Sequence, residues 1–372
     1  MSGQEAQEAL SGSVEGAARA NIKRLLIVRL GAMGDIIHTL PAANALRQAF
    51  PESEIGWVIE EKWAELLCTL PTPRSGARSA QRPLVERLHT VNTGKWRRAP
   101  VAMQTWLEIA AAISELRAPE YDVAVDFQGA LRSALIARWS QARKIYGPAQ
   151  PREIVASMFY GHPVVVQGSH VVEQNLSIAE AVTGISSRDA HTIFPKDERA
   201  DQERSCWLQQ RGITDFVLLA PGAGWGAKQW PSERYAEVAR CLAAQDLKIL
   251  VNSGPGEEPL AAAVVTASNG AAEKIPLTLT QLIAFTRRSR LVIGGDTGPI
   301  HLAAALKIPV VAIFGPTDPA RNGPYATKSI VLRSPSSTTS HSHGAAIEPG
   351  LLSISVEEVV AGARRMLGNC RG

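Results

Sequence analysis

Short apolar runs alternate with longer amphipathic stretches in the first half of the chain. An apolar run of this length fits a buried strand, and apolar residues three and four positions apart fit a helix. Strands that alternate with helices predict a parallel sheet covered on both faces. The predicted strands are 25–28, 55–59 and 123–125, and the predicted helices run from the Gly31–Gly34 turn to Pro51, over 106–116 and over 131–139.

The same alternation starts again after a polar stretch in the middle of the chain. The predicted strands are 216–220, 248–251, 291–293 and 310–313, and the predicted helices are 232–244, 260–267, 299–305 and 356–367. Ser232 is placed to cap the first of these helices. The pattern predicts two successive α/β sandwiches, with ligands bound in a cleft at the carboxyl ends of the strands.

The length of the chain also favours two domains, because 372 residues exceed what one compact core usually holds. Residues 1–21 contain three glutamates and no apolar core, which predicts a flexible N-terminal extension and excludes a signal peptide. We expect an N-terminal Rossmann-like domain over 22–183, a polar linker over 184–201, and a C-terminal Rossmann-like domain over 202–372.

The composition excludes several classes of protein. Hydrophobic residues make up 45% and charged residues 20%, which argues against disorder, and no apolar window is long enough to span a membrane. The four cysteines show no paired spacing, so neither a disulfide framework nor a zinc site is indicated. A net charge of +4 is too small to indicate nucleic acid as a partner. These features predict a cytoplasmic protein.

Positive charge is concentrated in residues 74–98, where seven lysines and arginines accompany the single acid Glu86. A basic segment of this kind is more often a solvated loop. The alternative is a surface for an anionic substrate or an anionic lipid.

The turn after the first strand carries Gly31, Gly34 and Asp35. Two glycines at this spacing are an incomplete dinucleotide-binding fingerprint. Asp35 can cap the following helix, or its carboxylate can face the ligand and act as a general base. Position in the sequence does not choose between these roles.

Three segments of the second half have residue types suited to a nucleotide. Asp296, Thr297 and Gly298 precede a helix whose first amides could bind a pyrophosphate; Asp296 could instead cap it, and His301 could be a half-buried structural histidine. Gly222 and Gly224 belong to a glycine-rich loop with Lys228, whose ammonium suits phosphate oxygens. Glu257 or Glu258 could hold a ribose, or either could be an exposed glutamate at a helix start.

Several segments taken together resemble the heptosyltransferases of glycosyltransferase family 9. They are MGDIIHTLPA at 33–42, WVIEE at 57–61, DFQG at 126–129, RSA at 132–134, KQWP at 228–231, DTG at 296–298, HL at 301–302 and GPTDP at 315–319. No single segment is decisive, but their common order makes the resemblance specific.

The resemblance implies a GT-B fold, with two Rossmann-like domains facing a central cleft. It implies inverting, metal-independent transfer of heptose from ADP-L-glycero-D-manno-heptose to the Kdo of the lipopolysaccharide inner core, with no cofactor. The donor would bind the C-terminal domain, and an anionic lipid-linked saccharide would bind the N-terminal one. The enzyme would bind peripherally to the inner face of the cytoplasmic membrane, with no nucleic-acid partner.

The resemblance also assigns residues. Asp35 matches the catalytic base and Lys228 the lysine that contacts the diphosphate. The remaining donor-binding positions are Gly222, Gly224, Glu257 or Glu258, Asp296, Thr297, Gly298 and His301. The acceptor-binding positions are Lys95, Arg97, Arg98, Gln128, Arg132 and Arg152.

Other functions remain open on the sequence. The loop before Lys228 has Gly224-Trp225-Gly226 where the family's first-heptose enzyme has paired threonines, which leaves the donor sugar undecided. The alternatives are a different nucleotide-sugar enzyme of GT-B fold, such as an epimerase or a transferase for another sugar, and a nicotinamide-dependent oxidoreductase. The incomplete glycine fingerprint disfavours the oxidoreductase.

Overall fold

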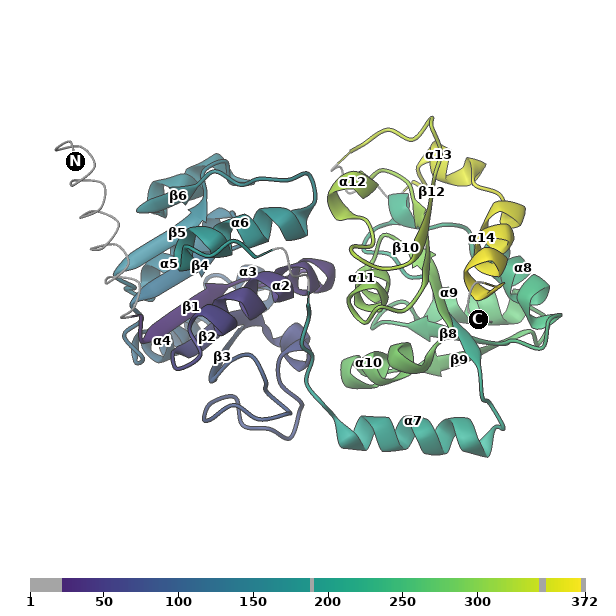
Figure 1. The fold of residues 1–372 in the computed structure, drawn as a ribbon, viewed down its shortest axis with the longest axis horizontal. Coiled ribbons are helices and arrows are strands. Elements are labelled where there is room, and N and C mark those ends of the chain that lie inside the picture. The colour runs from purple at the N-terminus through teal and green to yellow at the C-terminus, as the bar shows by residue number, and fades with distance from the viewer. Residues whose placement is uncertain (1–21, 188–190, 341–345, 369–372) are drawn as a thin grey trace, which may run out of the picture. The chain divides into compact units, whose positions relative to one another are not determined.

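The computed structural model describes residues 22–187, 191–340 and 346–368, and the chain divides into two compact units (Figure 1). Unit 1 runs to Gly31 and includes Thr39–Gly168 and Val172–Lys196. Unit 2 comprises Ala32–His38, Ser169–Val171 and the chain from Asp197 onward.

Unit 1 is built on a six-stranded sheet with the order β3-β2-β1-β4-β5-β6, and each neighbouring pair is parallel. Its strands are β1 (Arg24–Val28), β2 (Glu54–Glu60), β3 (Arg87–Val91), β4 (Val123–Asp126), β5 (Lys144–Pro148) and β6 (His162–Val164). The helices are α2 (Met33–Ala49), whose start belongs to unit 2, α3 (Thr93–Arg98), α4 (Met103–Arg117), α5 (Leu131–Trp139) and α6 (Val171–Thr183), with 3-10 helices η1 (Glu61–Leu66) and η2 (Ile154–Phe159). Strand β1 lies at the centre, and its four apolar residues are fully buried.

Unit 2 repeats this plan with a parallel sheet in the order β12-β11-β10-β7-β8-β9. Its strands are β7 (Phe216–Ala220), β8 (Lys248–Ser253), β9 (Ala272–Pro276), β10 (Leu291–Gly295), β11 (Val310–Phe314) and β12 (Ser329–Arg333). Its helices are α7 (Glu198–Gln210), η3 (Gly226–Lys228), α8 (Ser232–Ala243), α9 (Glu258–Ala267), α10 (Leu279–Arg288), α11 (Gly298–Ala305), α12 (Pro319–Asn322), α13 (Pro349–Ser353) and α14 (Val356–Gly368).

Helices cover both faces of the second sheet. Alternate residues of each strand point to opposite sides, so each side chain packs on one face or the other. Val217 and Leu219 belong to the apolar cluster formed with α8, α9 and α14. Phe216 points the other way and packs edge to face on Phe285 of α10, with ring centroids 6.1 Å apart. Continuous apolar runs such as FVLLA are therefore buried on both faces, as expected of a parallel sheet.

The predicted strands and helices of both halves are present. Residues 131–139 and 216–220 form a helix and a strand with the predicted bounds. Ser232 does not cap α8 as predicted, because it is already the first helical residue and Pro231 occupies the cap position without a side-chain hydrogen bond.

The prediction that residues 74–98 form a solvated loop is wrong. The segment contains strand β3 and helix α3, and Arg82 is buried with its guanidinium donating to the carbonyl oxygens of Pro73, Ala77 and Val85. The other paired cations form Arg74–Glu61, Arg78–Glu86, Arg87–Glu54 and Lys95–Glu108 ion pairs. Three of these four acids lie outside the segment, so much of its excess charge is compensated from elsewhere in unit 1.

The chain passes from unit 1 to unit 2 between Lys196 and Asp197, inside the predicted linker. The last residues of that linker form the first turn of α7, which begins at Glu198. The predicted N-terminal extension, 1–21, lies outside the described residues. Within the described ranges, no helix is both long enough and apolar enough to cross a membrane.

Candidate active site

The loops that carry the predicted donor residues meet at one edge of unit 2. The carboxyl ends of β7, β8, β10 and β11 lie along the same edge, because these strands are parallel neighbours in the sheet. The glycine-rich loop follows β7, the loop with Glu257 follows β8, and Asp296 follows β10. Open α/β sheets bind their ligands at this edge.

Lys228, Asp296 and His301 form a buried charged cluster at this edge. The Lys228 ammonium donates to Asp296 Oδ2, and Asp296 Oδ1 lies 3.0 Å from His301 Nε2. The Asp296 side chain is 5% exposed and that of Lys228 is 11% exposed. The structure thus brings Lys228 together with two predicted donor residues, Asp296 and His301, that lie 68 or more positions later in the sequence.

Asp296 is held ionised by its two partners. Burial by itself would raise the pKa of this carboxyl, but the hydrogen bond from His301 and the charges of His301 and Lys228 outweigh it. The pKa of Asp296 therefore lies well below its ordinary value. Since the ionised carboxylate only accepts hydrogen bonds, His301 Nε2 carries the proton of the shared bond.

Trp225 contacts the same lysine. The Lys228 ammonium lies 4.3 Å from the centre of the Trp225 ring, a cation–π contact. Two different groups, one carboxylate and one aromatic ring, therefore restrict the position of the ammonium. Sequence reasoning noted Trp225 only as a departure from the family pattern, and nothing in the spacing indicated this contact.

The structure distinguishes between Glu257 and Glu258. The Glu257 carboxylate accepts a hydrogen bond of 3.0 Å from the Gly254 N–H, and it lies against Gly222 so closely that a Cβ there would overlap it. Burial raises the pKa of the Glu257 carboxyl, although the Gly254 N–H opposes the shift. Glu258 is the exposed first residue of α9. Glu257 is therefore the glutamate that meets the glycine-rich loop.

Thr297 and Gly298 form the N-terminus of α11. Thr297 is the cap residue, with extended backbone angles and no side-chain cap bond, and its hydroxyl donates to Gly295 O over 3.3 Å. Pro299 occupies the first turn, where its missing N–H costs nothing. The positive end of the helix dipole thus lies beside the buried cluster.

Asp35 is the third residue of α2, in the part of that helix grouped with unit 2. Its Oδ2 accepts a hydrogen bond of 3.1 Å from the Ala32 N–H, which is the capping role considered from the sequence. In the same unit a Cβ on Gly34 would overlap the imidazole of His301, and the His38 and His301 rings lie 4.4 Å apart. The turn with Asp35 therefore lies beside the charged cluster. Its role as a base stays a prediction.

The predicted acceptor residues of unit 1 fall into two groups: Gln128, Arg132 and Arg152 lie near the end of β4, and Lys95, Arg97 and Arg98 lie on α3, after β3. Gln128 Oε1 accepts from the Leu30 N–H over 3.0 Å, so its side chain ties the two strand ends together. Arg132 donates to Thr93 Oγ1 over 2.7 Å and so connects α5 to α3, the helix that carries Lys95, Arg97 and Arg98. The backbone of Arg152 packs on Gly129.

Sequence reasoning missed the group that organises this loop, Asp126. Its carboxylate is fully buried and accepts bonds from the Gln128 and Gly129 N–H groups and from the hydroxyls of Ser133 and Tyr160. A lone aspartate closing a buried strand was the available signal.

At this edge of the unit 2 sheet, four buried polar side-chain atoms have no hydrogen-bond partner among the described residues. They are Asn252 Oδ1, Ser253 Oγ, His301 Nδ1 and Thr317 Oγ1. Asn252 and Ser253 end β8, Thr317 follows β11, and His301 lies on α11. No cluster of three or more potential metal ligands occurs in the part of the chain that the structure describes.

Comparison with known proteins gives concordant results. A family model described as Glycosyltransferase family 9 (heptosyltransferase) matches residues 109–349. Lipopolysaccharide heptosyltransferase 1 of Escherichia coli (strain K12) is 28% identical over 317 residues, which cover 84% of this chain and 94% of that protein.

Solved structures agree. The E. coli heptosyltransferase WaaC with ADP-2-deoxy-2-fluoro heptose has a TM-score of 0.71 and 25% identity, covering 92% of this chain and 99% of that one. WaaC with ADP has a TM-score of 0.73 and 26% identity over the same shares of the two chains. The predicted fold class is confirmed: the chain has the GT-B fold, with two Rossmann-like α/β domains.

Proposed function

The chain belongs to glycosyltransferase family 9 (heptosyltransferase), and we propose that it transfers L-glycero-D-manno-heptose from ADP-heptose to the Kdo of the lipopolysaccharide inner core. That it is a glycosyltransferase follows from the family. The donor and acceptor are proposed because its relative is named for lipopolysaccharide and a solved neighbour binds an ADP-heptose analogue. The observation that carries the proposal is the buried Lys228–Asp296–His301 cluster beside the N-terminus of α11.

The donor edge of unit 2 suits an ADP-sugar. Lys228 and the start of α11 present positive charge to a diphosphate. The Glu257 carboxylate, next to Gly222, is placed to accept hydrogen bonds from a ribose. Gly222 and Gly224 allow the backbone of the loop to approach the nucleotide closely.

The reaction is an inverting displacement with Asp35 as general base. The acceptor hydroxyl oxygen bonds to the anomeric carbon of heptose as the bond from that carbon to the ADP oxygen breaks. The hydroxyl proton passes to the Asp35 carboxylate, and the negative charge that develops on ADP is stabilised by Lys228 and the α11 amides. These groups would stabilise the negative charge on ADP that a bound metal ion could otherwise stabilise, so we propose a metal-independent reaction without a cofactor.

The acceptor is an anionic lipid-linked sugar bound by unit 1. Arg132 and Arg152, with Lys95, Arg97 and Arg98 on or near α3, supply cations for its carboxylates and phosphates. Gln128 contributes through the loop that it holds in place. The protein would act in the cytoplasm and bind peripherally to the inner face of the membrane.

Product analysis tests the proposal. The protein is incubated with ADP-heptose and a panel of truncated lipopolysaccharide acceptors, and the products are identified by mass spectrometry. We expect a single heptose to be added to the acceptor that ends in Kdo. Transfer only to acceptors that already carry heptose, or only from another nucleotide-sugar, would refute the stated substrates and leave the family unchanged.

A second donor remains a candidate because Trp225 occupies the loop before Lys228 and contacts its ammonium. Thermal-shift ranking of ADP, UDP, GDP and NAD separates the nucleotides, since a ligand that binds only the folded state raises the melting temperature. ADP should give the largest shift. A larger shift with UDP or GDP would favour another GT-B enzyme, and a shift with NAD alone would favour an oxidoreductase.

A further inference from the structure

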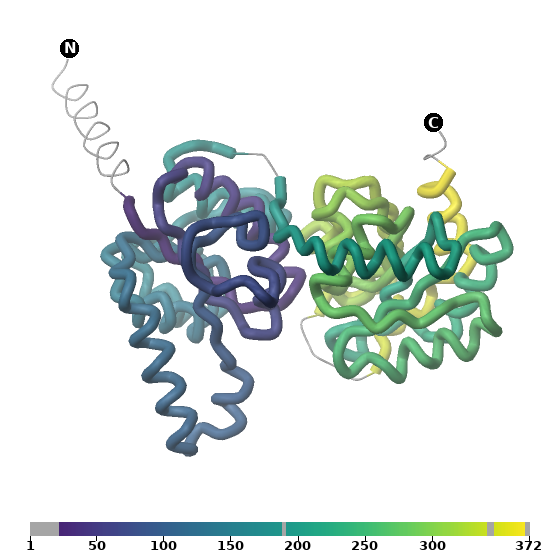
Figure 2. The backbone as a smooth tube through the Cα atoms, turned by 90° about the horizontal axis from the view of Figure 1, so that it is seen from below, coloured from purple at the N-terminus to yellow at the C-terminus, as the bar shows by residue number. Residues whose placement is uncertain are grey.

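Helices α3 and α4 form a hairpin that leaves the body of unit 1, visible in Figure 2 as the blue arm around residue 100. Its tip and the first turns of α4 carry four exposed apolar side chains. They are Val101 at 93% exposure, Met103 at 75%, Trp106 at 59% and Leu107 at 57%. Single exposed apolar residues are common, but four within seven positions form a patch that calls for an explanation.

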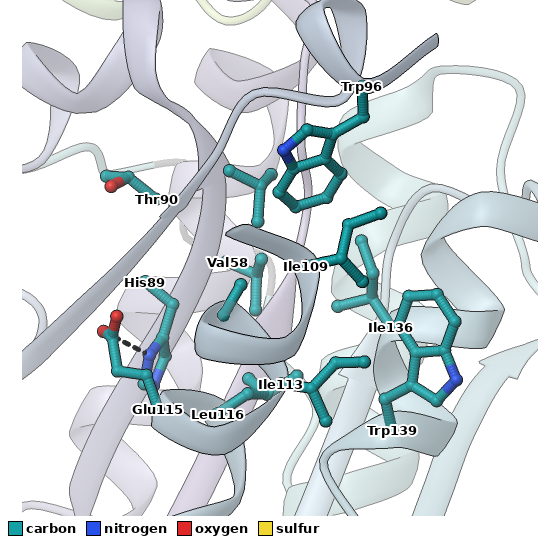
Figure 3. Close-up of a pocket in the computed structure, with 12 residues that line it drawn as sticks. Val58, His89, Thr90, Trp96, Ile109, Ile113, Glu115, Leu116, Ile136 and Trp139 are labelled. Atoms are coloured by element: carbon teal, nitrogen blue, oxygen red, sulfur yellow. Dashed lines mark hydrogen bonds and ion pairs between the residues drawn. The ribbon is translucent and has the colours of Figure 1, made fainter. Parts of the chain in front are cut away.

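The inner face of the hairpin is already packed. Trp96 of α3 and Ile109 and Ile113 of α4 line a small apolar pocket together with Ile136 and Trp139 of α5 (Figure 3). The cavity of about 20 Å³ holds no more than about one water molecule, so these side chains form a core and leave no room for a ligand. The exposed residues lie elsewhere on the hairpin.

Polar bonds hold the tip in shape. Glu108 of α4 accepts from Lys95 Nζ over 2.6 Å and from Trp96 Nε1 over 3.3 Å. The Thr105 hydroxyl donates to Ala99 O over 2.8 Å. The two helices are thus fixed to each other, and the exposed side chains are presented on a defined structure.

The exposed residues of α4 share one face of the helix. Met103, Trp106 and Leu107 stand at positions i, i+3 and i+4, which are neighbours on a helix surface. Arg97 and Arg98 close α3 just before the tip, and both are exposed and form no ion pair among the described residues. The patch therefore combines apolar side chains, a tryptophan and two uncompensated cations.

We propose that this patch, formed by Arg97, Arg98, Val101, Met103, Trp106 and Leu107, docks on an anionic lipid bilayer. The apolar side chains would enter the boundary between headgroups and acyl chains, where tryptophan is favoured, and the arginines would bind lipid phosphates. The proposal deepens the proposed function, which gives the enzyme a lipid-linked acceptor. It locates the membrane contact on one hairpin and adds insertion of apolar groups to charge attraction.

Charge favours a lipid surface over a second copy of the chain. A two-fold symmetric dimer through this patch would bring the same surface of both copies together. Arg97 and Arg98 would then approach their own equivalents, and like charges at an interface are unfavourable. An anionic bilayer satisfies both the cations and the apolar face.

Vesicle sedimentation with the full chain tests the proposal. Vesicles of phosphatidylcholine are compared with vesicles that contain phosphatidylglycerol as well, over a range of salt concentrations. We expect binding to the anionic vesicles that weakens with salt. Arg97→Gln with Arg98→Gln should weaken partitioning about 30-fold, which corresponds to about fivefold per cation. Arg364→Gln with Arg365→Gln, an adjacent exposed pair on α14, is the matched control and should bind normally.

A second pair of variants tests insertion separately from charge. Trp106→Ser with Leu107→Ser should weaken binding by about tenfold or more, because each loses apolar contact with lipid. Leu70→Ser with Ile185→Ser removes two equally exposed apolar side chains elsewhere in unit 1 and should have no effect. Trp106→Phe should keep binding but remove most of the fluorescence quenching by brominated lipids.

Three outcomes would overturn the proposal: wild-type protein that does not bind anionic vesicles, hairpin variants that bind like wild type, or a concentration-dependent dimer abolished by Trp106→Ser with Leu107→Ser.

An assay of heptose transfer to a soluble acceptor without a lipid separates the membrane-docking proposal from the proposed function. The Trp106→Ser, Leu107→Ser variant should retain that activity. Absence of any transfer by the wild type would refute the proposed function while leaving the vesicle result standing.

Discussion

Replacing Asp296 by asparagine removes the negative charge that Lys228 and His301 share and keeps the size of the side chain. The carboxylate is 5% exposed, and the ammonium that donates to it is 11% exposed. After the substitution the lysine charge remains in a site with little water, and the amide can satisfy only part of the former bonding. We expect unit 2 to lose stability.

The expected loss is about 2–4 kcal/mol at neutral pH. Removing one partner of a buried ion pair costs about 3–5 kcal/mol, and the amide oxygen recovers part of this by accepting one bond. Asp215→Asn is the matched control, because it breaks the exposed Asp215–Arg290 pair of the same unit, at 3.2 Å. An exposed pair contributes about 0–1 kcal/mol. The two losses should therefore differ several-fold.

Urea denaturation followed by circular dichroism measures both losses. In a thermal melt the midpoint of the Asp296 variant should fall by roughly 4–16 °C, at about 2–4 °C per kcal/mol for a unit of this size. Adding Lys228→Met to Asp296→Asn removes both charges and should restore part of the stability. If Asp296→Asn costs no more than Asp215→Asn, Lys228 and Asp296 do not form a desolvated ion pair.

The loss should also depend on pH. Since the pKa of Asp296 is lowered in the folded protein, the carboxylate stabilises the fold above the ordinary pKa of an aspartate, about 3.9. That contribution disappears as the pH falls through the lower, folded-state pKa. The difference in free energy of unfolding between wild type and Asp296→Asn should therefore be full at neutral pH and shrink below about pH 4. A difference that grows on acidification would contradict the assigned shift.

Three further predictions concern catalysis. Asp35→Asn should abolish transfer and leave ADP affinity within a few-fold of wild type by calorimetry; near-normal turnover in a folded variant would leave Asp35 as a capping residue only. Lys228→Ala should weaken ADP-heptose binding and also slow the chemical step in single-turnover kinetics, because charge grows on the leaving group; a change confined to acceptor KM would place the lysine elsewhere. Glu257→Gln should weaken ADP binding about tenfold while Glu258→Gln, its exposed neighbour, should not, and equal effects would refute the choice of Glu257.

The sequence predicted those parts of the fold that rest on local apolar runs. The strand over 216–220 is apolar throughout and buried on both faces, so its pattern was unambiguous. Strand β3 was missed because Arg87 and His89 interrupt its apolar residues. Both are accommodated by distant partners: Arg87 pairs with Glu54, and His89 bonds Glu115 and Tyr121. Such long-range pairs leave no local signal.

The site, too, could be predicted from the sequence only in part. The rule that ligands bind at the carboxyl ends of parallel strands, with the family resemblance, placed Lys228 and Asp296 on one edge, and the structure joins them. Spacing could not choose between Glu257 and Glu258, because the choice depends on where α9 begins. Glu257 is the residue before the first helical turn, which turns its carboxylate back to Gly254.

The contacts of Lys228 also bear on how a donor would be bound. A free lysine side chain loses up to about 2 kcal/mol of conformational freedom when it is fixed. Here Asp296 and Trp225 restrict the ammonium, so most of this loss occurs during folding and little remains for donor binding. The carboxylate also offsets the lysine charge, which limits how strongly the ground-state diphosphate is attracted. If the proposed function holds, a cation that is already fixed in place needs no reorganisation as negative charge develops on the departing ADP, and we expect Lys228 to stabilise the transition state for this reason.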